Sequence, residues 1–266
     1  LPGQTLTYTI TGGADSAKFS IVGATGVLTF VAAPSYESPT DIGGNNVYDV
    51  QVTVSDGTLT DLQDIAVTVT AVNDNNPVIT SNGGGATAAV NVAENSTAVT
   101  TVTATDADLP GQTLTYTITG GADAAKFSIV GATGVLTFVA APSYESPTDI
   151  GGDNVYDVQV TVSDGTLTDL QDIAVTVTAV NDNNPVITSN GGGASAAVNV
   201  AENSTAVTTV TATDADLPGQ TLTYTITGGA DSAKFSIVGA TGVLTFVAAP
   251  NYESPTDAGG DNVYDV

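Results

Sequence analysis

The sequence predicts an all-β protein built from tandem antiparallel β-sandwiches. The chain repeats itself: the segment LPGQTLTYTITGGAD begins at Leu1, Leu109 and Leu217, a period of 108 residues. Within each copy, short segments alternate apolar and polar residues between turn signals, which is typical of strands with one buried and one solvated face. A period of this length is the size of one domain, so the 266 residues hold about two to three modules.

Five segments of the middle copy are predicted to be strands. In the second of them, TLTYTIT, the leucine, tyrosine and isoleucine face one side and the threonines the other, and the fourth, VYDVQVTV, alternates in the same way. No segment shows a sustained helical period, although Gly120–Lys126 is predicted to hold one short turn capped by Asp123. The predicted strands are Ala98–Thr105, Thr113–Thr119, Val135–Phe138, Val155–Val162 and Ile173–Val180.

The stretch AVNDNNP marks the predicted junctions between modules. Its proline, Pro77 or Pro185, has no backbone N–H to donate to a β-ladder and therefore ends the preceding strand. In this framing the first module lacks its first strands and the third lacks its last two. The predicted domains are residues 1–72, 78–180 and 186–266, joined by linkers at residues 73–77 and 181–185.

The charge balance is strongly acidic, with 28 aspartates and glutamates, three lysines, no arginine and a net charge of −25. This argues against nucleic acid or an anionic membrane as a partner and in favour of cations. The competing explanation is a solvated acidic surface of the kind that salt-adapted proteins carry. The absence of histidine and cysteine removes the commonest general base and the usual zinc ligands. No apolar run is long enough for insertion into a membrane.

Acidic and amide motifs recur once per module, in the order VAENST, ATDAD, YESP, VTVSDG and VNDNNP. Carboxylate, amide and main-chain carbonyl oxygens suit a hard cation, and Ca²⁺ takes about six to eight of them. The alternative is turn chemistry alone, because aspartate and asparagine also favour turns. Asp41, Asp149 and Asp257 lie outside these motifs, and we expect solvated loop or strand-edge positions for them.

In this order the motifs resemble the calcium-binding signature of cadherin repeats, and they are most similar to the bacterial cadherin-like repeats of large surface adhesins. The resemblance covers the whole 108-residue period. It implies Greek-key, immunoglobulin-like sandwiches of the cadherin type, arranged as an extended rod with Ca²⁺ between consecutive domains. Asn95-Ser96-Thr97 fits the glycosylation pattern, but its overlap with the EN motif makes coincidence the favoured explanation.

The resemblance also implies a ligand set for each junction. At the first junction the implied ligands are Glu37, Asn73, Asp74, Asn75, Asp106, Asp108 and Asp164. At the second junction they are Glu94, Glu145, Asn181, Asp182, Asn183, Asp214 and Asp216. Two positions depart from the family: Ala71 and Ala179 replace an aspartate that opens the linker, and Ser35, Ser143 and Asn251 replace an acidic residue. The ion held by NDN and DAD keeps its expected ligands and is the best supported.

The near-identity of the copies favours a structural role over catalysis. A catalytic site is needed once per chain, whereas repeated copies supply length, stiffness or multivalency. The implied function is a calcium-rigidified adhesive segment of a secreted bacterial surface adhesin or an extracellular (biofilm) matrix filament. Its expected partners are neighbouring copies of the module and other copies of the chain. The alternative is an accessory, non-catalytic repeat region of a secreted polysaccharide-active enzyme. No catalytic residue is predicted, because tryptophan is absent and the other aromatic residues occupy apolar strand positions.

Overall fold

The computed structural model describes residues 3–266, which divide into two compact units. The first unit comprises the described residues up to Val90 together with Ala98–Val139 and Tyr156–Val175. The second comprises Asn91–Thr97, Ala140–Val155 and Thr176–Val266. The elements of the described residues are strands and short 3₁₀ helices, with no α-helix among them, which confirms the predicted all-β class.

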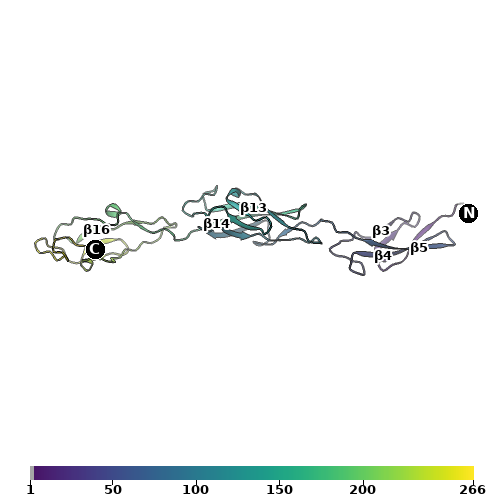
Figure 1. Ribbon diagram of the computed structural model, residues 1–266, viewed down its shortest axis with the longest axis horizontal. Coiled ribbons are helices and arrows are strands. Elements are labelled where there is room, and N and C mark those ends of the chain that lie inside the picture. The colour runs from purple at the N-terminus through teal and green to yellow at the C-terminus, as the bar shows by residue number, and fades with distance from the viewer. Residues whose placement is uncertain (1–2) are drawn as a thin grey trace. The chain divides into compact units, whose positions relative to one another are not determined.

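The first repeat forms two small antiparallel sheets with the orders β1-β4-β5 and β2-β3. The long strands β4 and β5 lie side by side over their whole length (Figure 1). The elements of this repeat are β1 (Thr7–Gly12), η1 (Ser16–Lys18), β2 (Phe19–Ile21), β3 (Leu28–Phe30), β4 (Val47–Ser55) and β5 (Thr60–Thr68).

The middle repeat has the fullest set of strands. Their orders are β10-β13-β14-β7 in one sheet, β11-β12-β8 in a second and β6-β9 in a short pair. The elements are β6 (Val78–Ile79), β7 (Thr87–Ala93), β8 (Ala98–Thr101), β9 (Ala104–Thr105), β10 (Thr115–Gly120), η2 (Ala124–Lys126), β11 (Phe127–Ile129), β12 (Val135–Phe138), β13 (Val155–Ser163) and β14 (Thr168–Thr178).

The third repeat has the sheet orders β15-β17 and β16-β19-β18. Residues 223–228 repeat the sequence of β10 but form no strand, because residues 263–266 are all that corresponds here to its partner β13. The elements are β15 (Val186–Ile187), η3 (Ser189–Gly191), β16 (Ala206–Thr209), β17 (Ala212–Thr213), η4 (Ser232–Lys234), β18 (Phe235–Ile237) and β19 (Val243–Phe246).

The strand predictions missed three strands, took two strands for one, and placed β14 at Ile173–Val180 where the structure has it at Thr168–Thr178. The strand predicted at Ala98–Thr105 is divided into β8 and β9, because the N–H of Val102 leaves the ladder and donates to the carbonyl of Gly134 at 2.8 Å. Gly134 has a φ of +69°, and a Cβ there would lie 2.0 Å from the Val102 oxygen, so the approach requires glycine. The prediction missed β6, β7 and β11: two of them are very short, and β7 is rich in alanine, a weak strand former.

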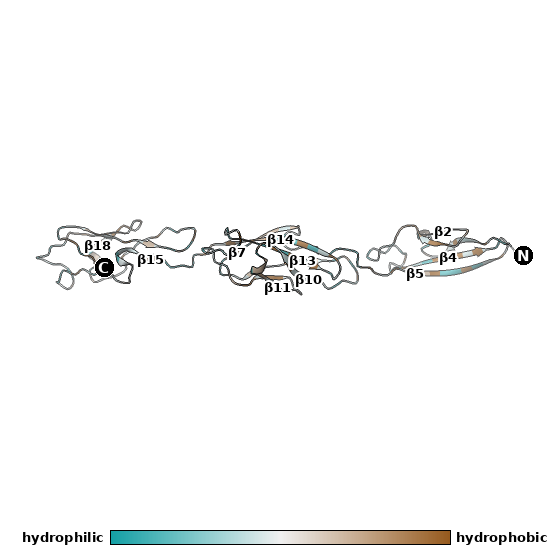
Figure 2. Ribbon diagram, turned by 90° about the horizontal axis from the view of Figure 1, so that it is seen from above, coloured by the Kyte–Doolittle hydropathy of each residue, from teal (hydrophilic) through white to brown (hydrophobic). Residues whose placement is uncertain are grey.

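The core follows the predicted alternation along β13. Tyr156, Val158, Val160 and Val162 are buried, and β13 lies between β10 and β14 in the middle repeat (Figure 2). Aromatic rings close this core, with the Phe127 and Phe138 centroids 4.6 Å apart and Tyr156 edge-on to Phe138 at 5.2 Å. Such ring pairs contribute about 0.5–1.5 kcal/mol beyond their area burial.

Several aspartates outside the motifs are buried and bind backbone N–H groups. Asp149 is 7% exposed, and its carboxylate accepts the N–H groups of Asp153 and Asn154, so the expectation of a solvated loop position was wrong. Asp41 and Asp257 are buried in the same way. Asp123 occupies the N-cap of the predicted short turn, but its side chain makes no capping hydrogen bond and instead accepts the N–H of Asp157 at 3.0 Å.

Candidate metal centres

Two groups of three acidic side chains lie together, each with carboxylate oxygens within 4.8 Å of one another. The aspartate cluster lies within the first unit, and the glutamate cluster lies within the second. The aspartate cluster consists of Asp106, Asp108 and Asp164, and the glutamate cluster of Glu94, Glu145 and Asp182. All six residues belong to the ligand sets that the sequence resemblance implies.

Two turns position the aspartate cluster. The DAD turn follows β9, where Asp106 Oδ1 accepts the N–H of Asp108 at 3.0 Å. The SDG turn follows β13, where Asp164 Oδ1 accepts the N–H groups of Thr166 and Leu167, both at 2.7 Å. In both turns one oxygen satisfies the backbone. The Oδ2 atoms of Asp106 and Asp164 are buried and accept no hydrogen bond from the described residues.

The linker brings amide groups to the same cluster. Asn75 donates its side-chain N–H to Asp108 Oδ1 at 2.6 Å, and Asp108 is only 1% exposed. Asn73 donates to the Thr166 hydroxyl at 3.2 Å, while its own Oδ1 is buried without a hydrogen-bond donor. Asn73, Asp106 and Asp164 thus each present a buried acceptor oxygen that no donor satisfies. Because buried polar atoms are nearly always partnered, this arrangement fits a cation.

Hydrogen bonds keep Asp164 ionised. Burial raises the pKa of its carboxyl, but the N–H donors of Leu167 and Thr166 outweigh this effect and hold the pKa below its ordinary value. The cluster therefore presents Asp164 as a carboxylate at neutral pH. The carboxylate oxygens of the cluster lie within 4.8 Å of one another, which is less than the screening length of about 8 Å in physiological salt. Mobile ions therefore screen the repulsion between these carboxylates poorly.

The glutamate cluster joins three segments of the second unit. Glu94, directly after β7, is 3% exposed and accepts the N–H groups of Tyr144 at 2.8 Å and Val180 at 2.6 Å. Glu145 accepts the N–H of Leu217 at 3.3 Å, which connects the YESP loop to the segment that follows the next DAD turn. Solvent exposure increases within the cluster: Glu94 is buried, Glu145 is half-buried and Asp182 is exposed.

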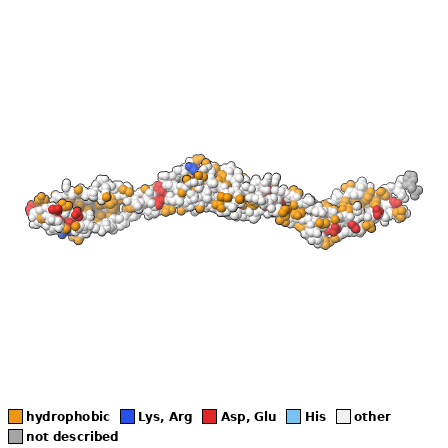
Figure 3. All heavy atoms as spheres, viewed as in Figure 1, with side chains coloured by type: hydrophobic (Ala, Val, Ile, Leu, Met, Phe, Trp, Pro, Cys, Tyr) orange, Lys and Arg blue, Asp and Glu red, His pale blue; other side chains and the backbone are white. Residues whose placement is uncertain are grey.

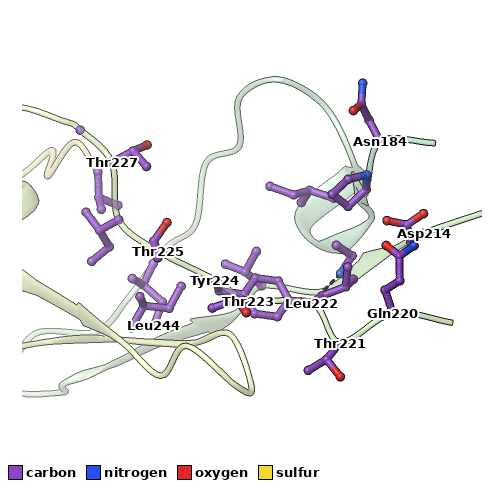
Figure 4. A pocket seen from close by; sticks show the side chains of 18 of the residues that line it. Asn184, Asp214, Gln220, Thr221, Leu222, Thr223, Tyr224, Thr225, Thr227 and Leu244 are labelled. Carbon is purple, nitrogen blue, oxygen red and sulfur yellow. Dashed lines mark hydrogen bonds between the residues drawn. The ribbon is translucent and has the colours of Figure 1, made fainter. Parts of the chain in front are cut away.

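The second DAD turn repeats the bonds of the first. Asp216 is 1% exposed and accepts the Asn183 side-chain N–H at 2.7 Å, as Asp108 accepts that of Asn75. It also accepts the Gln220 amide at 3.2 Å, a bond that Asp108 does not share among the described residues. The Asn183 side chain is the main cause of a lowered pKa for Asp216, and it outweighs the burial that raises the pKa. Figure 4 shows Asp214 and Gln220 together at one end of a cavity of 820 Å³, with Tyr224 and Leu244 along its apolar part.

Not every implied ligand joins a cluster. Glu37 accepts a hydrogen bond from the Ser35 hydroxyl at 3.1 Å, and its other oxygen is buried without a hydrogen-bond donor. Asp74 is exposed and accepts the Asn75 amide at 3.0 Å. The acidic implied ligands that belong to neither cluster are Glu37, Asp74, Asp214 and Asp216. The remaining implied ligands are the linker amides Asn73, Asn75, Asn181 and Asn183. These assignments of ligands to ions stay predictions.

The sequence analysis did not identify three residues that bond the implied ligands at these sites. Thr166 accepts the linker amide of Asn73, Gln220 donates to Asp216, and Asn95 donates to Asp182. Their neighbours in the sequence were the available signal, because each lies within four residues of an implied ligand. Figure 3 shows the setting, with groups of acidic side chains and few lysines on the face in view.

Fold and sites together define a tandem array of antiparallel β-sandwiches with acidic, oxygen-only sites beside the linkers. Residues 88–180 match the family model described as "Cadherin domain". Over these residues the middle repeat is therefore similar to a cadherin domain. No helix in the described part of the chain has the length and apolarity that crossing a membrane requires.

Relatives with established names are cadherins. Mouse Cadherin EGF LAG seven-pass G-type receptor 2 is 34% identical over 255 residues, which cover 93% of this chain and 8% of the relative. Human Protocadherin Fat 1 is 30% identical over 242 residues, which cover 86% of this chain and 5% of the relative. The chain thus spans less than a tenth of the length of these two curated relatives. Both are mammalian proteins, so the bacterial part of the sequence resemblance stays a prediction.

Solved structures show the same fold. The chain resembles mouse Cadherin-23 EC22-24 with a TM-score of 0.61 and 22% identity, covering 94% of this chain and 77% of that one. It resembles human CDH23 EC21-23 with a TM-score of 0.65 and 21% identity, covering 94% and 81%. These likenesses confirm the predicted cadherin-type β-sandwiches.

Proposed function

We propose that this chain is a segment of a secreted array of cadherin-type repeats that Ca²⁺ makes rigid, and that its role is structural and adhesive. The main support is the aspartate cluster, where buried acceptor oxygens of Asn73, Asp106 and Asp164 have no hydrogen-bond donor among the described residues. A divalent cation supplies the positive partner that these atoms lack.

The residues present fit calcium better than a transition metal. Both clusters consist of carboxylates, with the linker amide Asn73 beside the aspartate cluster, and hard oxygen donors suit Ca²⁺. Asp106, Asp108 and Asp164 would hold an ion together with Asn73. Glu94, Glu145 and Asp182 would hold an ion of the glutamate cluster.

The ion would act by removing repulsion and by joining segments. Without a cation, carboxylates this close favour any movement that separates them, so the linkers are expected to loosen. With Ca²⁺ bound, the same groups become ligands drawn from the middle repeat and a linker. Together with the ligands that the resemblance implies in the flanking repeats, Glu37, Asp214 and Asp216, they would fix the angle between repeats and stabilise them. An array stiffened in this way forms an extended rod.

The biological setting follows from repetition and charge. Near-identical copies and a net charge of −25 suit an extracellular spacer in millimolar calcium, where extracellular modules work with dissociation constants of about 10⁻⁴–10⁻³ M. We assign it to a bacterial surface adhesin or matrix filament at the cell surface, with neighbouring repeats and other copies of the chain as partners. The segment itself has no catalytic role, and nucleic acid and the membrane interior are not its partners.

Calcium titration tests the proposal. Isothermal calorimetry on the calcium-free chain should show saturable binding, and the melting temperature should rise with calcium concentration. Small-angle scattering should give a larger maximum dimension in calcium than in chelator. Absence of binding heat and of any melting shift would overturn the calcium role, and identical scattering profiles would overturn the stiffening role. A catalytic domain in the complete reading frame would instead assign the segment to a polysaccharide-active enzyme.

A further inference from the structure

Asp182 is the exposed member of the glutamate cluster, and its carboxylate lies beside Glu94 and Glu145 although its side chain is exposed. Glu94 is buried and held by two backbone N–H groups, whereas an exposed aspartate is free to rotate unless another group holds it. Asp182 Oδ1 accepts the Asn183 amide at 2.9 Å, and Asp182 Oδ2 accepts the Asn95 amide at 2.5 Å. The Asn95 bond reaches back from the linker to the preceding repeat.

The backbone of Asn95 is fixed in a conformation that few residues adopt. Its φ is +62°, in the left-handed region, where asparagine is one of the few side chains commonly found. Its own N–H donates to the carbonyl of Pro142 at 2.9 Å. The Asn95 side chain is therefore a donor on a fixed support, next in sequence to the buried ligand candidate Glu94. The atom that the glycosylation pattern would modify, Nδ2, is the one bonded to Asp182.

We propose that Asn95 is a positioning residue that holds Asp182 in the glutamate cluster and thereby strengthens cation binding there. The inference rests on the proposed calcium function. Carboxylates that bind metals are commonly oriented by hydrogen bonds from residues that do not touch the metal, and removing such a partner weakens metal affinity by about 10- to 100-fold.

The chain contains a matched control for this residue. Asn203 repeats Asn95 in the third repeat, with a φ of +63° and an N–H bonded to the carbonyl of Pro250 at 2.9 Å. Among the described residues, no linker carboxylate accepts the side-chain amide of Asn203. Asn95→Gly and Asn203→Gly therefore remove the same side chain from the same backbone conformation, but only the first removes a bond to a linker carboxylate. Glycine is chosen because it tolerates a positive φ.

Calorimetric titration with calcium chloride, repeated with terbium through tyrosine-sensitised luminescence, tests the role of Asn95. Asn95→Gly should weaken the event of the glutamate cluster about tenfold, while Asn203→Gly changes it less than about twofold. Both variants should melt at similar temperatures in chelator. In an Asp182→Asn background, Asn95→Gly should add little further loss, because its target carboxylate is already gone.

The outcomes separate the two proposals. If the unmodified chain binds calcium and Asn95→Gly binds it as tightly as Asn203→Gly does, the positioning role is wrong while the calcium function stands. Equal losses from Asn95→Gly with and without Asp182→Asn would also contradict it, since the effect would not pass through Asp182. If the unmodified chain binds neither calcium nor terbium, the proposed function fails, and this inference fails with it.

Discussion

The aspartate and glutamate clusters stand at two copies of one linker sequence, yet they use different residues. Asp106 and Asp108 form a cluster with Asp164, while their copies Asp214 and Asp216 form none. In the same way Asp182 joins Glu94 and Glu145, while its copy Asp74 stays exposed and outside any acidic cluster. The linker residues are the same in both places, so the neighbours from the flanking repeats decide which group assembles.

This comparison gives a rule for a junction with complete neighbours. Asp164 completes the aspartate cluster, and Glu94 with Glu145 completes the glutamate cluster. A junction flanked by two complete repeats is expected to hold both clusters.

The largest effect is expected from Glu94→Gln. Glu94 is the buried member of its cluster and bonds two backbone N–H groups, so the amide removes a charge and places a donor against the N–H of Tyr144 or Val180. Calcium affinity at the glutamate cluster should fall by about 100-fold or more, measured by calorimetry. Glu202→Gln is the matched control, because Glu202 bonds the N–H of Tyr252 but belongs to no cluster. Equal losses in both variants would contradict the comparison.

A smaller effect is expected from Asp164→Asn. The change keeps an acceptor for the N–H groups of Thr166 and Leu167 but removes one charge from the aspartate cluster, so calcium affinity should fall about tenfold. Asp56 is the same residue in the first repeat and makes the same turn bonds to Thr58 and Leu59 without joining a cluster. Asp56→Asn should leave calcium binding unchanged. Weakening by Asp56→Asn would show that turn stability, and not charge, matters.

The smallest effect is expected on the melting temperature at acid pH. The pKa of Asp216 is lowered by the Asn183 amide, so the stability from this bond is fully present above the ordinary aspartate pKa of about 4 and is lost as pH falls through the lower folded value. Melting temperatures of the calcium-free chain should be level from about pH 7 to 5 and should decline below about pH 4. Asn183→Ala should flatten this decline. An unchanged decline in that variant would assign the acid sensitivity to other carboxylates.

The sequence by itself determined the repeat, the all-β class and the chemical type of the sites. The 108-residue period and the alternation along segments such as VYDVQVTV depend only on local order, and so do the recurring NDN, DAD and YESP motifs. The alternation of apolar and polar residues is a local property, because successive side chains of a strand point to opposite faces. The ligand types followed for the same reason, since oxygen-only side chains suit hard cations wherever they meet.

Only the tertiary structure decided which copies of a motif act together. TYTITG is the strand β1 at Thr7–Gly12 and the strand β10 at Thr115–Gly120, and in both places it pairs with a strand that lies far away in the sequence, β4 or β13. Asp164 bonds the N–H groups of Thr166 and Leu167 within its own turn, and only the fold brings it to Asp106 and Asp108, which lie far earlier in the sequence. Long-range partners thus supply the strand pairing, the burial and the neighbouring carboxylates, which a local sequence pattern does not contain.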